Sequence, residues 1–599
     1  ALMDRNSLAP ENDDCSTAAG IELGTPLSGS TAFANDSLGF EYFCHGDVWY
    51  SFTPPETRHY CISVTPAGEN DAFVGLYDAC GGRPLAYGAN TVCYPLEAGS
   101  VYYIAVGGAA TESDENIALD FQLTIAYASS EQTRFSGGMG AEHNPFLIGN
   151  RDDLRYLSRN QELYLNDSFL MTSDIDMTGV EDFTPIGFVQ DPYALNTFTG
   201  SFEGANHEIA HLSVLSATGS VGVFGVAKNA RISGIRLRDC DIEYSGDSVG
   251  KNSYAGGIAG EIVNSEITGC NVSGSVTSTN DAAGGIVGNI VPSDPSYGLF
   301  STIQQCQSAA SVYGRQTAGG IAGNLFYLSG YNPYSENLSR IARCSVTGPV
   351  FSEKTAGGII GNAGQLNIVN SSFTGFVQSG AVAGGIAGIS YDARIGNCIV
   401  AGSVATSKMN LFARSHAIIG DNYYYTFYYD LSSYGNLWSQ ELTGQTDSGI
   451  YDPLPSGPVS TAELLVPESF NRYSWDFHTP VWRMIEGVTI PRLAGVSPGL
   501  DETCTLEVNL LGEGAILGGT PGMNEYRYGQ PAILDIAPES LPYFSHWIAG
   551  DGLTGDGGDD PHLAFIMEGN RTVTAVFNAE TSHPVTSLED LEKIGTSPE

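Results

Sequence analysis

One apolar, glycine-rich hexapeptide recurs through the middle of the chain. AGGIAG stands at residues 255–260, 318–323 and 383–388, and related copies begin at 220, 283, 356 and 415. The steps between the seven starts are 35, 28, 35, 38, 27 and 32 residues. Repeats of this length indicate a solenoid, a propeller or an array. Short alternating runs rich in Gly, Ser, Thr, Val and Ile separate the copies, and they predict strands and turns rather than helices.

A second pattern runs in step with the hexapeptide. Each later copy is followed by a strand of the approximate form I-x-x-C-x-x-x-G-x-V, whose fourth position holds Cys270, Cys306, Cys344, Ser371 and Cys398. In a parallel β-helix these positions stack into one internal column, so we expect buried, reduced cysteines that serve packing. A zinc site is disfavoured because tetrahedral ligands must converge, whereas neighbouring rungs stand about 4.8 Å apart.

The charge balance and the positions of the cysteines limit which partners and which cellular compartment the chain can have. The chain has 67 Asp+Glu against 25 Lys+Arg, a formal charge of −42, which disfavours nucleic acid and membrane surfaces as partners. No apolar run is long enough to cross a bilayer, so we expect no direct membrane insertion. Five of the 11 cysteines fall within the first 93 residues, where disulfides could hold a small β domain together. We therefore expect an extracellular or cell-surface protein whose leader has already been removed.

The repeats resemble a known family. The hexapeptides and their I-x-x-C/S strands follow an entry segment with NPFLIGNRDDLRYLS (144–158) and FTGSFEGANHEIAHLSV (198–214), and they precede WDFHTPVWRMIEGVTIPRL (475–493). Together these segments look like the GLUG-motif repeats of bacterial secreted and surface proteins. The resemblance covers roughly residues 144–495 and implies a right-handed parallel β-helix.

Two flanking regions resemble other modules. Residues 11–127, with GDVWYSF, LYDACGG and AGSVYYI, resemble the pre-peptidase C-terminal domain, a β-sandwich. Residues 501–579 resemble the internalin-type B-repeat, a small β-rich module. The expected fold is all-β, a right-handed parallel β-helix between an N-terminal sandwich and a small C-terminal module. The expected ranges are 1–130 (sandwich), 131–500 (β-helix with its caps), 501–580 (B-repeat-like module) and 581–599 (a linker or the start of a further repeat region).

One disulfide is predicted within the sandwich. Cys80 and Cys93 flank a predicted hairpin and are the expected pair. The pairing of Cys15, Cys44 and Cys61 stays open.

The segment HEIAH at 207–211 matches the zinc-peptidase pattern H-E-x-x-H, which needs a helix with Glu208 as the base. Here a glycine-containing turn precedes the motif and an alternating run follows it, so we expect a strand. On a strand, His207 and His211 would stand about 13 Å apart at 3.3 Å per residue, too far for one zinc ion. No catalytic residue and no metal site are expected here.

The acidic loop GDGLTGDGGDD at 550–560 is a candidate for calcium. Its spacing fits neither an EF-hand, which needs a distal bidentate Glu, nor the calcium-binding nonapeptide solenoid. A solvated turn is favoured, and no cofactor is expected.

Aromatic residues crowd the segment DNYYYTFYYDLSSYGNLW at 421–438. Such rings could stack on sugars or anchor a partner protein. The favoured alternative is that they cap the open end of the solenoid, because every solenoid needs a cap. The candidate partner or glycan contacts are Tyr423, Tyr424, Tyr425, Tyr428, Tyr429 and Trp438.

These features together predict a non-enzymatic adhesive or structural protein of the bacterial cell surface, acting as a rigid multidomain stalk or assembly component. The expected partners are further copies of the chain or other surface proteins, with glycans as a further candidate. Two alternatives stay open. The chain could be the non-catalytic region of a secreted peptidase or other hydrolase, or a carbohydrate-binding or carbohydrate-active β-helix.

Overall fold

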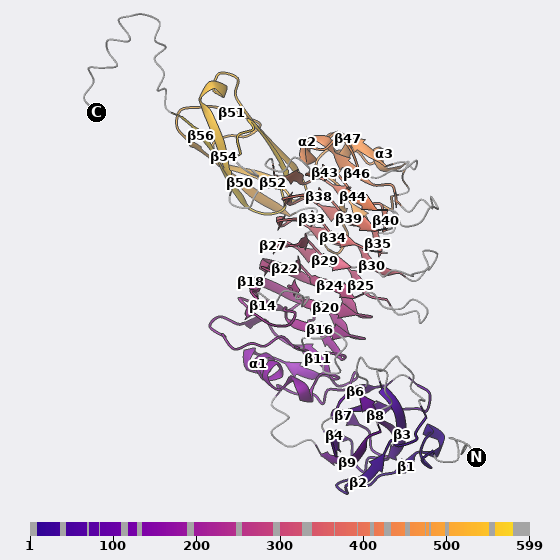
Figure 1. The fold of residues 1–599 in the computed structure, drawn as a ribbon. Coiled ribbons are helices and arrows are strands. Elements are labelled where there is room, and N and C mark those ends of the chain that lie inside the picture. Colours follow the sequence, from indigo (N-terminus) through magenta and orange to yellow (C-terminus); the bar gives the residue numbers. More distant parts are fainter. Residues whose placement is uncertain are drawn as a thin grey trace, which may run out of the picture.

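Three β-rich units follow one another along the chain in a computed structural model (Figure 1). A sandwich lies at one end, a long solenoid rises from it, and a smaller unit lies beside the far end of the solenoid. No helix among the described residues is both long and apolar enough to cross a bilayer. The structure describes residues 9–578 except for 36–43, 69–70, 83, 110–117, 128–134, 189–196, 247–253, 292–299, 326–337, 365, 392, 408–412, 424–432, 450–455, 472, 474, 478–480, 497–501 and 550–557.

The N-terminal unit packs two sheets face to face around one apolar core. Its strands alternate between apolar side chains that fill this core and polar side chains outside, as in β4 (Arg58–Pro66) and β9 (Asp120–Tyr127). A short 3₁₀ helix, η2 (Cys15–Thr17), precedes the strands. The five-stranded sheet contains β1 (Ala19–Gly20), β3 (Cys44–Phe52), β8 (Tyr102–Ala109), β5 (Ala72–Tyr77) and β6 (Ala86–Ala89), and the four-stranded sheet contains β2 (Leu27–Ser30), β9 (Asp120–Tyr127), β4 (Arg58–Pro66) and β7 (Thr91–Leu96).

The predicted Cys80–Cys93 disulfide is wrong. The sulfur atoms pair instead as Cys15–Cys80 and Cys61–Cys93. The reason is that β6 and β7 are consecutive but belong to different sheets, so the chain crosses from one layer to the other between them. Cys93 then lies directly opposite Cys61 in the β4–β7 ladder, while Cys80 stays with the other sheet near η2.

The solenoid consists of four parallel sheets that each coil visits in turn. The six-stranded and seven-stranded sheets meet at the hexapeptide, and the ten-stranded and fifteen-stranded sheets complete each coil. The six-stranded sheet contains β19 (Ala255–Gly256), β23 (Ala282–Gly284), β28 (Thr317–Gly319), β33 (Thr355–Gly357), β38 (Val382–Gly384) and β43 (Arg414–His416). The seven-stranded sheet contains β16 (Phe224–Lys228), β20 (Ala259–Val263), β24 (Val287–Val291), β29 (Ala322–Leu325), β34 (Ile360–Ala363), β39 (Ala387–Tyr391) and β44 (Ile419–Tyr423).

The two larger sheets extend the solenoid toward the sandwich. The ten-stranded sheet contains β10 (Phe146–Ile148), β11 (Ser168–Met171), β13 (Ser201–Glu203), β17 (Arg231–Ser233), β21 (Glu266–Thr268), β25 (Thr302–Gln304), β30 (Ser339–Ala342), β35 (Leu366–Val369), β40 (Arg394–Gly396) and β45 (Ser433–Tyr434). The fifteen-stranded sheet contains β12 (Ile175–Asp176), β14 (Glu208–Ala210), β15 (Ser213–Ser216), β18 (Arg236–Tyr244), β22 (Asn271–Ser278), β26 (Gln307–Ser308), β27 (Ser311–Gly314), β31 (Ser345–Val346), β32 (Val350–Ser352), β36 (Ser372–Phe373), β37 (Phe376–Ser379), β41 (Ile399–Val400), β42 (Ser403–Thr406), β46 (Leu437–Ser439) and β47 (Gly457–Val459). One continuous apolar core fills the space between the four sheets.

The hexapeptides occupy equivalent corners of successive coils, as the repeat predicts. The first residues of six copies pair in one row, from Ala255 through Ala283 to Ser415, and Val221 of the earliest copy bridges to Ala255. Their fifth residues form a second row in the seven-stranded sheet, from Phe224 to Ile419. The predicted all-β solenoid is therefore confirmed.

Glycine is required at this corner because neighbouring coils approach too closely for a side chain. A Cβ atom on Gly320 would stand 2.3 Å from the carbonyl oxygen of Gly358 and 2.4 Å from a methyl group of Val346. Both contacts are far below van der Waals distance, and one of them is to the backbone of the next coil. The glycines thus set the spacing between coils.

The predicted cysteine column lies inside the corner between the ten-stranded and fifteen-stranded sheets. Cys270, Cys306, Cys344 and Cys398 are free and fully buried, and Ser371 takes the equivalent place in its coil. Each of these thiols donates to the carbonyl oxygen two residues earlier, as from Cys344 to Ala342 at 3.4 Å, and Ser371 makes the same contact to Val369 at 3.1 Å. The side chains therefore satisfy main-chain oxygens at the turn, in addition to filling the core.

Both ends of the solenoid are covered. Near the sandwich, α1 (Arg151–Arg159) buries Leu154 and Leu157 in the solenoid core, and η5 (Gln161–Leu163) follows it. The Asn150 side chain caps α1 by accepting from the backbone amides of Asp152 and Asp153. At the far end, a separate apolar cluster covers the last coil. Its elements are α2 (Gln440–Thr443), η7 (Glu463–Leu465), α3 (Glu468–Asn471), β48 (Trp482–Arg483) and β49 (Arg492–Leu493).

The C-terminal unit packs a four-stranded sheet on a three-stranded sheet. Its first sheet is ordered β52–β50–β56–β54 and its second β51–β53–β55. The bounds are β50 (Thr503–Leu511), β51 (Ile516–Leu517), β52 (Gly522–Arg527), β53 (Pro531–Ile536), η8 (Leu541–Tyr543), β54 (Phe544–Ala549), β55 (His562–Ile566) and β56 (Arg571–Phe577).

Replacing Gly320 with alanine should lower the free energy of unfolding of the solenoid by about 2 kcal/mol or more, because the new methyl group would push two coils apart. Denaturant unfolding followed by circular dichroism measures the change. Gly457→Ala is the matched control, since only the Tyr473 hydroxyl at 3.9 Å lies within contact distance of a Cβ there. Equal losses in the two variants would contradict the spacing role of the hexapeptide.

The thiols of the column should resist alkylation in the native protein, even at mildly alkaline pH. All four thiols are fully buried and so inaccessible, and burial raises the pKa of the Cys398 thiol to about 12, so its reactive thiolate is also scarce. Mass spectrometry after alkylation, with and without denaturant, checks this for the four cysteines. Labelling of the column before unfolding, or a disulfide within it, would refute the packing role, and the same peptide map should show Cys15–Cys80 and Cys61–Cys93.

Candidate functional site and interaction surfaces

The HEIAH segment forms a strand, as the sequence predicts. Glu208–Ala210 is β14, which pairs in parallel with β12 and β18 on the side of the solenoid. His211 follows the strand with a φ of 56°, a left-handed backbone that no α-helix contains. The helix that the zinc-peptidase pattern requires is therefore replaced by a solenoid strand.

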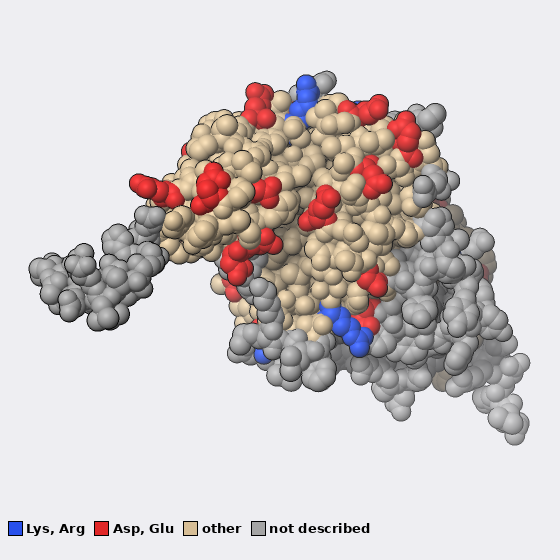
Figure 2. Space-filling view, turned by 90° about the horizontal axis from the view of Figure 1, so that it is seen from above, with Lys and Arg blue, Asp and Glu red and all other residues tan. Residues whose placement is uncertain are grey.

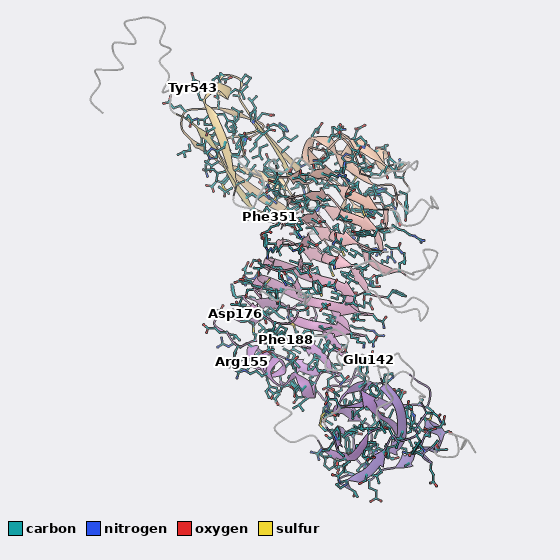
Figure 3. The ribbon with its side chains drawn as sticks, in the orientation of Figure 1. Glu142, Arg155, Asp176, Phe188, Phe351 and Tyr543 are labelled. Carbon is teal, nitrogen blue, oxygen red and sulfur yellow. A yellow bond between two sulfur atoms is a disulfide. The ribbon has the colours of Figure 1, made fainter. Side chains whose placement is uncertain are left out.

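Neighbouring charged groups hold the polar side chains of this segment. His207 Nδ1 lies 3.1 Å from Asp174 Oδ1, and His211 Nδ1 lies 3.0 Å from Asp176 Oδ1, while Glu208 accepts from Arg238 Nε at 2.6 Å. Asp176 lies at the outer edge of the solenoid (Figure 3). The two histidines thus face separate carboxylates, and in the described part of the chain no three His, Cys, Asp or Glu side chains gather as a metal site would need.

Local hydrogen bonds set the charge state of these carboxylates. The pKa of Asp174 is lowered mainly by the backbone amide of Glu208, with a further contribution from His207. The pKa of Asp176 is lowered by the hydroxyl and amide of Thr178 and then by His211. Both aspartates are therefore ionised at neutral pH and serve as acceptors, which is the opposite of the raised pKa that a general acid needs.

The aromatic segment at 421–438 lies only partly within the described residues. Trp438 lies in β46, exposes 3% of its surface, and donates from Nε1 to the carbonyl oxygen of Gln445 at 3.2 Å. Because Trp438 is part of the apolar core, the prediction that it contacts a glycan or partner is wrong. Tyr424, Tyr425, Tyr428 and Tyr429, together with the side chain of Tyr423, lie outside the described residues. The calcium candidate loop at 550–560 is described only from Gly558 onward.

A buried polar pair joins the sandwich to the solenoid. His59 Nε2 of β4 lies 3.3 Å from Asp167 Oδ1, and their side chains expose 9% and 0% of their surface. The His59 ring lies near the rings of Phe146 and Tyr164, with centroid distances of 5.7 and 6.4 Å. Burial raises the pKa of the Asp167 carboxyl, and the neighbouring His59 opposes that shift. Such a pair favours one geometry of the two units, because a shift of one unit against the other would leave a buried polar group without its partner.

Further hydrogen bonds hold the same joint. The backbone amide of Tyr87 donates to Asn166 Oδ1 at 3.1 Å, and Asn229 Nδ2 donates to the Tyr87 hydroxyl at 3.1 Å. These contacts come from different coils of the solenoid, so the sandwich cannot turn freely about the connecting segment.

A second buried pair joins the solenoid cap to the C-terminal unit. Arg492 Nη2 of β49 lies 2.8 Å from Glu568 Oε2, and the two side chains expose 3% and 7% of their surface. The guanidinium carbon lies 5.4 Å from the centre of the Tyr528 ring, and Ile566 enters the apolar cluster of the cap. Burial raises the pKa of Glu568, while Arg492 acts to lower it. Charge pairing and apolar packing therefore fix this unit against the last coil.

Sequence reasoning did not find either pair. His59 and Asp167 are 108 residues apart, and Arg492 and Glu568 are 76 residues apart. Each residue stands in an ordinary polar context in the sequence, and no local spacing links it to its partner. Only the three-dimensional arrangement of the units brings these groups together.

Two family models match parts of the chain. Residues 11–122 match a model described as galactose binding domain-like and associated with the type IX secretion system. Residues 251–277 match the GLUG motif. The predicted GLUG repeats are thus confirmed, and the set of modules fits a secreted or surface protein. No curated protein matches this chain.

Several solved structures are similar to parts of this chain at low identity. A Bacteroides ovatus protein described as a candidate immunoglobulin A1 protease is 19% identical, covers 60% of this chain and 95% of its own, and gives a TM-score of 0.41. The pre-peptidase C-terminal domain of a Bacillus anthracis collagenase is also 19% identical, covering 18% of this chain and 93% of its own, with a TM-score of 0.14. An IgA1 protease is 16% identical over 62% of this chain, which spans 29% of that protein, with a TM-score of 0.33. These likenesses carry no argument about activity.

Purified protein should cleave neither casein nor IgA, and the Glu208→Gln variant should behave like the unchanged chain. The expectation follows because Glu208 is held by Arg238 on a strand and the two histidines face different carboxylates. Proteolysis assays with and without a chelator provide the measurement. Chelator-sensitive cleavage that Glu208→Gln abolishes would overturn this interpretation.

Proposed function

We propose that this chain is a non-enzymatic, rigid β stalk of a secreted or surface protein, with an adhesive or structural role outside the cell. The observation that carries the proposal is the pair of buried polar joints, His59–Asp167 and Arg492–Glu568, one at each end of the solenoid. A catalytic protein needs a cleft with positioned reactive groups, whereas a stalk needs joints that do not bend. The joints supply that property directly.

The solenoid itself supports the same role. Its coils bond only to their neighbours along one axis, so length is gained by adding coils without building a larger core. The two disulfides of the sandwich stabilise the unit at one end against unfolding, as is common in exported domains. The expected partners are further copies of the chain or other surface proteins, which would attach through the end units.

Surface charge suits an exported stalk. Seen from the cap end, Asp and Glu side chains are spread over the face and Lys or Arg side chains are few (Figure 2). A formal charge of −42 favours the solubility of an exported chain.

The Arg492→Ala variant should loosen the C-terminal joint, because it leaves the Glu568 carboxylate buried without its counterion. The loss of this counterion should destabilise the joint by about 3 kcal/mol. Small-angle X-ray scattering of the full chain should show one extended rod for the unchanged protein and a broader range of conformations for the variant. Arg238→Ala is the control, since the exposed Arg238–Glu208 pair lies on the side of the solenoid. If the unchanged protein already scatters as flexibly linked units, the stalk proposal fails.

A further inference from the structure

The outer face of the ten-stranded sheet changes character along the solenoid. In its first half, acidic side chains are paired within the molecule. Glu203 accepts from Ser233, Glu266 accepts from Gln304 Nε2 at 3.1 Å, and Arg231 lies 3.6 Å from Glu142. Glu142 stands close to the sandwich in Figure 3. This half offers few open hydrogen-bonding groups.

The second half, from β25 to β45, instead presents arginine and amide side chains that have no partner among the described residues. Its described strands and the corners that follow them contain no Asp or Glu, although the chain as a whole has 67 acidic residues against 25 Lys+Arg. Six polar side chains here form no hydrogen bond or ion pair with the described residues. They are Gln305, Arg340, Arg343, Asn367, Asn370 and Arg394. We call this surface the arginine strip.

The strip is regular because the coils are in register. Arg340, Asn367 and Arg394 pair one above the other in β30, β35 and β40, which follow each other up one side of the solenoid (Figure 1). The two arginines are therefore about 10 Å apart along the axis, at roughly 4.8 Å per strand. On the next strand, β45, Tyr434 pairs with Gly396, two residues along from Arg394; it exposes 44% of its surface, and a Cβ on Gly396 would lie 2.5 Å from its ring. The ring therefore covers Gly396.

A second column of polar residues stands beside the first at the following corner. Arg343, Asn370 and Asn397 occupy equivalent positions with φ of 53°, 51° and 52°. Glycines with φ of 63°, 64° and 65° hold this corner in other coils, at Gly234, Gly269 and Gly435. A left-handed backbone costs a non-glycine residue about 1 kcal/mol, and for arginine it lacks the local side-chain compensation that asparagine has. Arg343 is therefore kept where glycine would be easier, which points to a use for its side chain.

We propose that the arginine strip binds a linear anionic glycan that lies along the solenoid axis. The arginines would pair with its carboxylates or sulfates, since the guanidinium fork suits planar and tetrahedral oxyanions. The amides between them would donate to and accept from hydroxyl groups, and the Tyr434 ring offers a stacking face for a sugar. An acidic peptide fits less well, because extended peptides bind along open strand edges and this surface is the face of a sheet whose strands are already paired.

The glycan proposal gives a ligand for the adhesive role in the proposed function, and it rests on that proposed function. The two ideas remain separable, because scattering tests the stalk and titration tests the strip. A solenoid that is rigid but binds no glycan would leave the stalk standing and end the glycan proposal.

The test is titration calorimetry of the full chain with three polysaccharides. Polygalacturonate carries carboxylates, dextran sulfate carries sulfates, and dextran carries neither. We expect one or both of the anionic polymers to bind, with weakening as ionic strength rises. The triple variant Arg340→Gln/Arg343→Gln/Arg394→Gln should bind about tenfold or more weakly, because three charged contacts are lost. Which anionic polymer binds more tightly decides between carboxylate and sulfate recognition.

Arg231→Gln is the matched control, since Arg231 lies on the same sheet but is already paired with Glu142. It should bind as the unchanged chain does, and circular dichroism should show all variants folded. Four results would overturn the proposal: no binding of either anionic polymer, equal binding of dextran, an equal loss in Arg231→Gln, or tighter binding of poly-glutamate than of both anionic polysaccharides.

Discussion

The hydrogen bonds between neighbouring coils are the interaction on which the whole molecule depends. They run along the solenoid axis in four parallel sheets, and the coils can form them only if their corners stack closely. The hexapeptide glycines make that approach available at each coil, and the internal column of cysteines satisfies carbonyl oxygens that the turns would otherwise leave open. Coil spacing, core packing and the regular outer faces all follow from this one arrangement.

Regular outer faces allow a repeating scaffold to carry a local function. Because strands stack in register, side chains from residues about 30 positions apart stand next to one another, as Arg340, Asn367 and Arg394 do. On another sheet, the pairing of β12 with β14 brings Asp174 and Asp176 within hydrogen-bonding distance of His207 and His211. Neither group could be recognised as a cluster without knowing the register. In a solenoid, functional surfaces arise from columns rather than from local motifs.

The sequence was sufficient for the fold and insufficient for its joints. The hexapeptide period, the Cys270-type column and the strand at HEIAH are all local or periodic signals, and the structure confirms them. The disulfide prediction failed because a hairpin was assumed where the chain passes between sheets, so Cys80 and Cys93 separate. Trp438 stood among six candidate contacts, and its burial could not be foreseen because composition alone cannot show which ring of an aromatic segment turns inward. The two joints could not be predicted from the sequence, because His59 and Arg492 meet their partners only when whole units are folded and packed together.

The cysteine column has a consequence for how such a chain matures. Four stacked thiols stand on neighbouring or near-neighbouring rungs, a spacing at which cross-linking is geometrically close, while the sandwich of the same chain carries two disulfides. In an environment where disulfides form, the cysteines of the column must therefore be protected from oxidation while those of the sandwich are oxidised. Stacking of the coils performs that sorting, since a thiol drawn into the core is withdrawn from exchange. For the column to stay reduced, the coils would have to close before oxidation is complete.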